Sequence, residues 1–261
     1  MEFCIDVNAN IMAHQDSFIK LKGRIGDLTF YKTKSGYLAR EKGGIDGNRI
    51  ANDPRFQRTR ENGAEFGRAG SAAKLLRDSL TSIISNGKDS AMSNRLTKLM
   101  LKVVQADAIN DRGMRMVLDA ETEMLKGFEF NANAQINSVL SVTITSNIDR
   151  ATGSLKVELP EFDPRVFVKT PQGATHFQFK AMGLALNFST GAKELNLQMG
   201  ALQPLDAIST ALSLDCDLTA NASDPLFLVF GVEFYQMVNG KNYPLNNGAH
   251  NGVCILNVAG I

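Results

Sequence analysis

The C-terminal half of the chain, residues 127–261, alternates apolar and polar positions with a period of two, as half-buried strands do. We expect eight strands there, at residues 128–136, 138–148, 154–159, 174–185, 194–199, 209–218, 225–236 and 253–258. Residues 226–230 read Leu-Phe-Leu-Val-Phe, a continuous apolar run that is typical of a central strand buried on both faces. Because no long helical pattern separates the strands, the sequence predicts an antiparallel β-sandwich.

The middle of the chain, residues 71–126, repeats its apolar positions every three to four residues, as amphipathic helices do. One stripe covers residues 72–84 and a second covers residues 96–104. A third helix is expected at residues 113–125. We interpret these stripes as faces that pack into a core rather than as a cofactor site.

Turn residues mark three hairpins. Near the N-terminus, Thr33-Lys-Ser-Gly36 separates two short β-prone runs, at residues 25–31 and 37–40. Further along, the loop 149–153 and the Asn239-Gly240 pair have hairpin chemistry, the latter typical of a two-residue primed turn. A lone hairpin is barely stable in water, so the N-terminal hairpin is expected to dock on its own domain or on a neighbour.

The N-terminal segment is basic and too poor in apolar residues to form a core. Residues 20–77 carry fourteen Lys and Arg against six Asp and Glu, a net charge of +8 in a chain whose total is +1. Residues 127–261 carry seven basic and eleven acidic residues, a net charge of −4. We therefore expect an α+β protein with an extended basic arm carrying a β-hairpin (1–70), a helical segment (71–126) and an antiparallel β-sandwich domain (127–261).

The sequence offers little catalytic or metal-binding chemistry. Its three Cys and three His residues are dispersed, with no CxxC, HxH or HExxH spacing, and the phosphate-binding and nucleophile motifs built on glycine are absent. Paired carboxylates such as Asp215 and Asp217 are more simply an exposed strand face than a reaction centre. We expect no enzyme activity, no cofactor and no metal site.

The targeting signals are equally sparse. The N-terminus lacks a basic region followed by a long apolar run, and no window of about eighteen apolar residues occurs. We expect the protein to stay in the cytoplasm or to leave as an assembled particle without a cleaved signal peptide. Either Met1 or Met12 is a candidate start.

A basic arm and an acidic sandwich in one chain favour head-to-tail self-association, which builds rings or filaments. We therefore expect a structural protein, the subunit of a filament, tube or virus-like particle. Two alternatives stay open: the arm, with its interleaved aromatic residues, binds nucleic acid, or the sandwich holds a glycan or peptide near residues 246–251. The candidate inter-subunit residues are Lys20, Lys22, Arg24, Phe30, Tyr31, Lys32, Lys34, Tyr37, Arg40, Arg55, Arg58, Arg60, Asp215, Asp217, Asp224 and Glu233.

Several segments also carry a family resemblance. They read KLKGRIGDLTFYKTK at 20–34, GYLAREKGG at 36–44, DPRFQRTREN at 53–62, DPLFL at 224–228 and GVEFYQ at 231–236. The chain after residue 12 thereby resembles a group of Bacteroidota proteins that share the KGxIGDLTFYKTK segment and have no assigned activity. The resemblance implies a taxonomic origin, and it carries over no functional residues.

Overall fold

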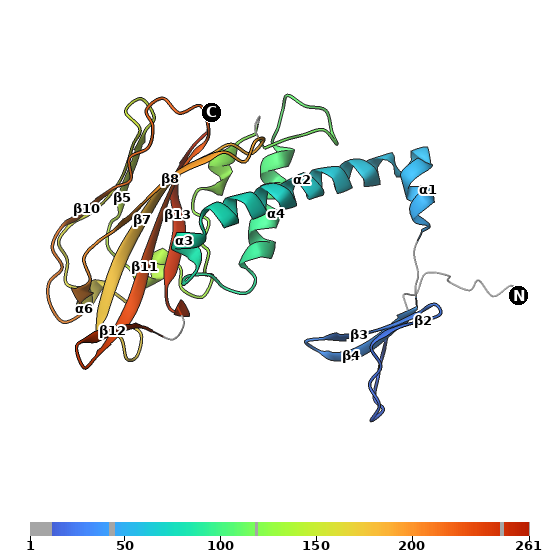
Figure 1. The fold of residues 1–261 in the computed structure, drawn as a ribbon, viewed down its shortest axis with the longest axis horizontal. Helices are drawn as coiled ribbons and strands as arrows, with labels where there is room; N and C mark the ends of the chain where they lie inside the picture. The colour runs from blue at the N-terminus through green and yellow to red at the C-terminus, as the bar shows by residue number, and fades with distance from the viewer. Residues whose placement is uncertain (1–11, 42–44, 118–119, 246–247, 261) are drawn as a thin grey trace, which may run out of the picture. The chain divides into compact units, whose positions relative to one another are not determined.

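The computed structural model describes residues 12–41, 45–117, 120–245 and 248–260. Helices and antiparallel sheets occur together, so the chain has an α+β fold with a β-sandwich in its C-terminal region (Figure 1). Two compact units divide the chain, Met1–Arg60 and Glu61–Ile261. We call the second unit the body.

The body is built around a six-stranded antiparallel sheet. Its central strand, β11, pairs with β7 on one side and with β12 and β13 on the other, and β7 also pairs with β8 and β9. The strands are β7 (His176–Leu186), β8 (Lys193–Met199), β9 (Gln203–Pro204), β11 (Leu226–Val238), β12 (Lys241–Pro244) and β13 (Gly252–Ala259). A second, three-stranded sheet has the order β10-β6-β5, with β5 (Thr145–Asp149), β6 (Ser154–Leu159) and β10 (Leu212–Asp215).

Each face of the six-stranded sheet is covered by a different layer (Figure 1). Helices pack on one face, and the three-stranded sheet packs on the other. The helices of this layer are α2 (Gln57–Ser79), α3 (Thr81–Ile84) and α4 (Met92–Gln105), with the short turn η2 (Thr122–Leu125). Two further short helices lie outside this layer: α5 (Ile136–Val139), which packs with the core on the other face of the sheet, and α6 (Pro164–Phe167). This three-layer arrangement explains why the central strands have no polar face.

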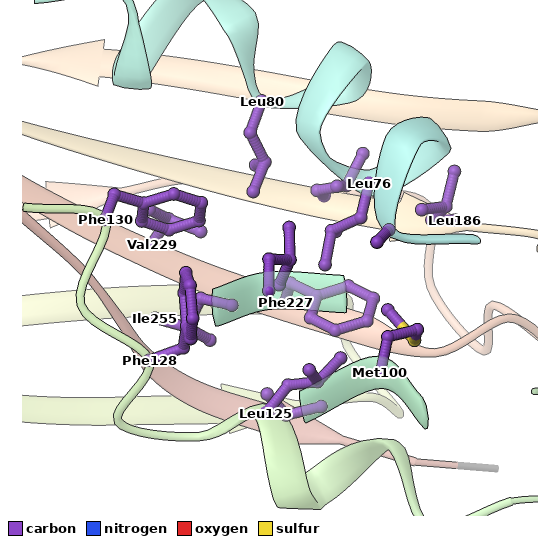
Figure 2. Close-up of a cluster of buried hydrophobic side chains, with 14 of the residues drawn as sticks. Leu76, Leu80, Met100, Leu125, Phe128, Phe130, Leu186, Phe227, Val229 and Ile255 are labelled. Carbon is purple, nitrogen blue, oxygen red and sulfur yellow. The ribbon is translucent and has the colours of Figure 1, made fainter. Parts of the chain in front are cut away.

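Strand β11 shows the arrangement residue by residue. Phe227 and Val229 point to the helical layer, where Figure 2 shows them among Leu76, Leu80 and other apolar side chains. Leu228 and Phe230, the alternate residues, lie between the two sheets. The apolar run 226–230 therefore forms a central strand buried on both faces, as predicted. Full burial of each such side chain contributes about 1.5–3 kcal/mol of stability.

Two of the expected strands and one expected helix are wrong. Residues 128–136 contain only an isolated bridge between Glu129 and Cys254, and most of 138–148 lies outside β5 because the chain forms α5 first. Among the described residues of 113–125, which exclude 118–119, only η2 is helical. Of the expected strand 209–218 only Leu212–Asp215 forms, as β10. The remaining expected strands and the 149–153 and Asn239-Gly240 hairpins are confirmed, with shifts of one or two residues at their ends.

Side-chain hydrogen bonds hold the loop 107–117 in place of the expected helix. Within the loop, the buried Asp107 carboxylate accepts hydrogen bonds from the backbone N–H groups of Ile109, Asn110 and Met116. Gly113 has a φ of 86°, which a helix does not allow, and its N–H donates to the Glu65 carboxylate, which is distant in sequence, at 2.9 Å. The periodicity of apolar positions reveals neither contact.

The N-terminal unit contains a four-stranded antiparallel sheet with the order β1-β4-β3-β2. Its strands are β1 (Met12–His14), β2 (Gly23–Ile25), β3 (Leu28–Thr33) and β4 (Gly36–Glu41). The predicted hairpin is its β3–β4 pair, and the turn is shorter than expected because Thr33 and Gly36 already face each other. Gly26, with a φ of 57°, makes the β2–β3 turn that adds a further strand.

After this sheet the chain forms two short helical turns, α1 (Gly47–Asn52) and η1 (Pro54–Phe56), and then enters α2. Asp53 accepts a hydrogen bond from the Arg55 N–H at 3.0 Å, with Pro54 at the first helical position. Helical structure thus begins well before residue 71.

Candidate interaction surface

The register of the N-terminal sheet assigns its side chains to two faces. Residues that are paired across strands share a face, and alternate residues lie on opposite faces. The Phe30 face consists of Ala13, Ile25, Leu28, Phe30, Lys32, Tyr37, Ala39 and Glu41. The Tyr31 face consists of His14, Arg24, Thr29, Tyr31, Thr33, Leu38 and Arg40. The first is mainly apolar with one cation and one carboxylate, and the second is polar and cationic.

This sheet has no core of its own. Leu38, at 9% exposure, is the only large apolar side chain that is buried within residues 12–41. On the Phe30 face, Ile25 is 62% exposed and Leu28 is 46% exposed. Phe18, which precedes β2, is 95% exposed. Small sheets need a covered apolar face to be stable, so this one lacks the usual source of stability.

Cations already engage the aromatic rings of the sheet. Lys20 Nζ and Lys32 Nζ lie 5.9 and 5.3 Å from the centre of the Tyr37 ring. The Arg40 guanidinium carbon lies 5.5 Å from the centre of the Tyr31 ring. Exposed cation–π contacts of this kind contribute about 0.5–1 kcal/mol each. These cations occupy ring surface that a nucleic-acid base would need for stacking.

Other candidate cations bind their own chain. Arg55 contacts the Asp53 carboxylate at 2.8 Å, and this hydrogen bond keeps the pKa of Asp53 below its usual value. The Arg60 guanidinium donates to the carbonyl of Ile50 at 2.7 Å and to that of Asp53 at 3.0 Å. Arg24 donates to the Gly26 carbonyl at 3.0 Å. By contrast, the remaining cations of the predicted set are exposed: Lys22, Lys34 and Arg58.

The four predicted acidic residues do not form one surface. Asp215 and Asp217 are exposed, and the Asp215 carboxylate contacts Lys156 at 3.3 Å. Asp224 is half-buried and accepts a hydrogen bond from the Asn187 amide at 2.8 Å. Its orientation is further fixed by its carbonyl, which accepts from Arg150. Only the first two are therefore placed to meet a partner through their carboxylates.

Glu233 does not belong to an exposed acidic surface, which corrects that part of the sequence interpretation. It is 4% exposed, contacts the Lys180 ammonium at 2.7 Å and accepts a hydrogen bond from the Tyr235 hydroxyl at 2.7 Å. Burial, followed by the neighbouring Glu233 carboxylate, raises the pKa of Tyr235 above its usual range. The partners come from β7 and β11, so linear spacing gave no signal of this pair.

The turn after Leu245, which was a candidate ligand loop, is used for internal packing. Positions 246–247 of this loop lie outside the described residues. The buried Asn251 side chain donates to the Asn86 carbonyl at 2.8 Å and accepts from the Phe234 N–H at 3.0 Å. These contacts tie the loop to α3 and β11 rather than leaving its polar groups for a ligand.

Two hollows of similar volume on the body are lined entirely by described residues. One, about 480 Å³, lies beside α2 and is lined by Gly67, Ser71, Leu75, Met116 and Phe188 among others. The other, about 510 Å³, lies on the three-stranded sheet, where Thr145, Glu158 and Ser213 line it. Sequence reasoning missed Glu158, whose place beside Ser213 follows from the β6–β10 register.

The described parts of the chain contain neither a cluster of metal-binding side chains nor a helix suited to cross a membrane. Among the described residues, no group of three or more His, Cys, Asp or Glu side chains gathers closely enough to hold a metal ion. Across the same parts of the chain, no helix has the length and apolar character that crossing a bilayer requires. Comparison with known proteins adds no further assignment: no protein-family model matches the chain, and no curated protein matches it at a significant level.

Proposed function

We propose that this protein is a structural subunit that self-assembles into a filament, tube or virus-like particle through its N-terminal sheet. The main support is the four-stranded sheet that buries one large apolar side chain and exposes Ile25 and Leu28 on one face. Such a face is stabilised when a neighbour covers it. In a homopolymer the neighbour is another copy of the same chain.

The distribution of charge and surfaces supports contacts between different parts of two copies. The sheet and the helical turns after it carry eleven basic and four acidic residues between residues 20 and 60, a net charge of +7. Residues 127–261 have a net charge of −4. Complementary potentials of this kind set the register of an interface. A contact between two unlike surfaces is heterologous, and it generates rings or open filaments.

Nucleic-acid binding is the less well supported reading of the same cations. Tyr31 and Tyr37 are engaged by Arg40 and by two lysines, and Arg55 and Arg60 bind groups of their own chain. A binding site for single strands needs free ring faces and free cations along one track. A gel-shift titration with single-stranded DNA or RNA separates the two readings, because nucleic-acid binding must produce a complex that weakens steeply as salt rises, whereas the purified chain self-assembles without nucleic acid.

Light scattering and negative-stain electron microscopy on the purified full chain test the proposal across protein concentrations. We expect the wild type to form large species. We expect the double substitution Ile25→Thr with Leu28→Thr, which keeps β propensity but removes apolar surface, to weaken association at least about 100-fold. Val166→Thr is the control, because Val166 is 71% exposed on the body. A wild type that stays monomeric at high concentration refutes the proposal.

A further inference from the structure

We propose that the outer face of the three-stranded sheet β10-β6-β5 receives the Tyr31 face of the N-terminal sheet from a second copy. This inference rests on the proposed function and assigns the two surfaces that meet. The outer face is defined by the outward positions of the three strands and of the residues that extend β10: Thr145, Asn147, Asp149, Ser154, Lys156, Glu158, Ser213, Asp215 and Asp217.

The outer face is a sheet surface that no layer of the body covers. The inward residues of the same strands, such as Leu155, Val157 and Leu214, are buried against the six-stranded sheet. Their outward neighbours are all polar, and Glu158, Ser213 and others along them are exposed. A polar sheet face of this kind suits a partner that offers complementary charge and hydrogen-bonding groups rather than apolar surface.

Charge identifies the partner. The nine outward positions carry four carboxylates, those of Asp149, Glu158, Asp215 and Asp217, and one cation. That cation is Lys156, whose ammonium lies 3.6 Å from the Glu158 carboxylate and 3.3 Å from the Asp215 carboxylate. One positive charge is therefore shared between two negative charges. The face keeps a net charge of −3 and favours a cationic partner.

The Tyr31 face has the complementary composition. It carries Arg24 and Arg40, both exposed, together with the hydroxyl groups of Thr29, Tyr31 and Thr33. Acidic residues are absent from its positions in β1 to β4, because Glu41 belongs to the opposite face. Guanidinium groups pair with carboxylates in a defined planar geometry, which gives the contact a fixed register.

Shape adds a second feature to the match. The hollow of about 510 Å³ on the outer face is lined by Thr143, Thr145, Glu158 and Ser213. The other half of its lining is apolar, Leu159, Pro160, Ala211 and Leu212, so the hollow offers hydroxyl groups and one carboxylate to a guanidinium and apolar surface to the methylene stem of the same arginine. The Phe30 face stays available for the apolar contact of the proposed function, since the two faces of one sheet point in opposite directions.

Charge reversal tests the pairing. Arg24→Glu with Arg40→Glu, and separately Asp215→Lys with Asp217→Lys, are each expected to weaken assembly by about tenfold or more. Mixing the two variants is expected to restore it, because each variant then offers the surface that the other needs. Asp206→Lys with Glu121→Lys is the matched control, since both acids are exposed and lie off the outer face. Circular dichroism checks that every variant is folded.

Each outcome of this experiment decides the assignment. Restored assembly in the mixture supports the pairing of the two faces. Charge variants that assemble like the wild type, or a mixture of weakened variants that stays dissociated, overturn the pairing and leave the proposed function intact. A monomeric wild type overturns both. If Ile25→Thr with Leu28→Thr abolishes assembly while charge reversal does not, the apolar face alone makes the contact.

Discussion

Replacing Glu129 by Gln tests how the body responds to a carboxyl group that is partly buried between β13 and α5. Its Oε1 atom accepts a hydrogen bond from the Ile136 N–H at 3.1 Å, and the carboxyl lies beside the Cys254 thiol. Burial raises the pKa of Glu129 from its ordinary value of 4.5 to about 7, although the Ile136 N–H and the Arg95 charge act in the opposite direction. Glutamine keeps the acceptor oxygen and removes the charge.

The direction of the pH effect on stability follows from the pKa of Glu129 in the unfolded and in the folded chain. Below pH 4.5 the carboxyl is neutral in both states, so Glu129 adds no pH dependence. Between pH 4.5 and 7 the unfolded chain loses its proton while the folded chain keeps it, so the free energy of unfolding falls as pH rises. A pKa difference of about 2.5 corresponds to about 3.4 kcal/mol. Because the side chain is only partly buried, solvent screening reduces this to about 2 kcal/mol.

Urea denaturation at pH values from 4 to 8 measures the effect as a difference between two proteins. We expect Glu129→Gln to match the wild type near pH 4 and to be more stable by about 2 kcal/mol at pH 8. Other titrating groups cancel in the difference. Glu161→Gln, at an exposed position, serves as the control and is expected to give a flat difference. A flat difference for Glu129→Gln itself would refute the reasoning.

Three further predictions concern packing and turns in the body. Asp107 has a folded pKa of about 2 against its ordinary 3.8, since backbone and side-chain hydrogen bonds outweigh burial. Above pH 4, the free energy of unfolding of Asp107→Asn should therefore be about 2 kcal/mol lower than that of the wild type. This difference in stability should shrink as pH falls towards 2, and acid titration followed by circular dichroism measures it. Gly153→Ala should destabilise by more than about 1 kcal/mol in urea, because φ is 78° and the added Cβ would lie 2.2 Å from the Leu218 carbonyl oxygen. Leu76→Ala should cost about 2–5 kcal/mol by thermal or urea unfolding, since Leu76 is fully buried in the helical layer.

Local chemistry determined the elements that the sequence predicted correctly. The run 226–230 becomes the centre of β11 because five consecutive apolar residues fit only a strand covered on both faces. The Asn239-Gly240 turn forms because both residues adopt positive φ, 52° and 74°. In both cases the residues that determine the structure lie within the element itself, so the local sequence is enough to predict it.

Distant contacts determined the elements that the sequence did not reveal. The expected helix at 113–125 gives way to a loop because Asp107 and Glu65 capture its N–H groups. Glu233 resembles a surface acid in sequence, yet Lys180 on the neighbouring strand neutralises it in the interior. The register of the strands places Glu233 beside Lys180 and points Glu158 outward. Register depends on the pairing of all the strands in a sheet, so it cannot be read from one strand alone.

The two faces of the N-terminal sheet place different demands on any assembly. Cation–π contacts at Tyr31 and Tyr37 contribute about 0.5–1 kcal/mol each, so they do not replace the burial of Ile25 and Leu28. A partner that met only the cationic Tyr31 face would leave the apolar Phe30 face in water. Under the proposed function, a copy that uses both faces therefore contacts more than one neighbour, which favours an extended polymer over a closed dimer.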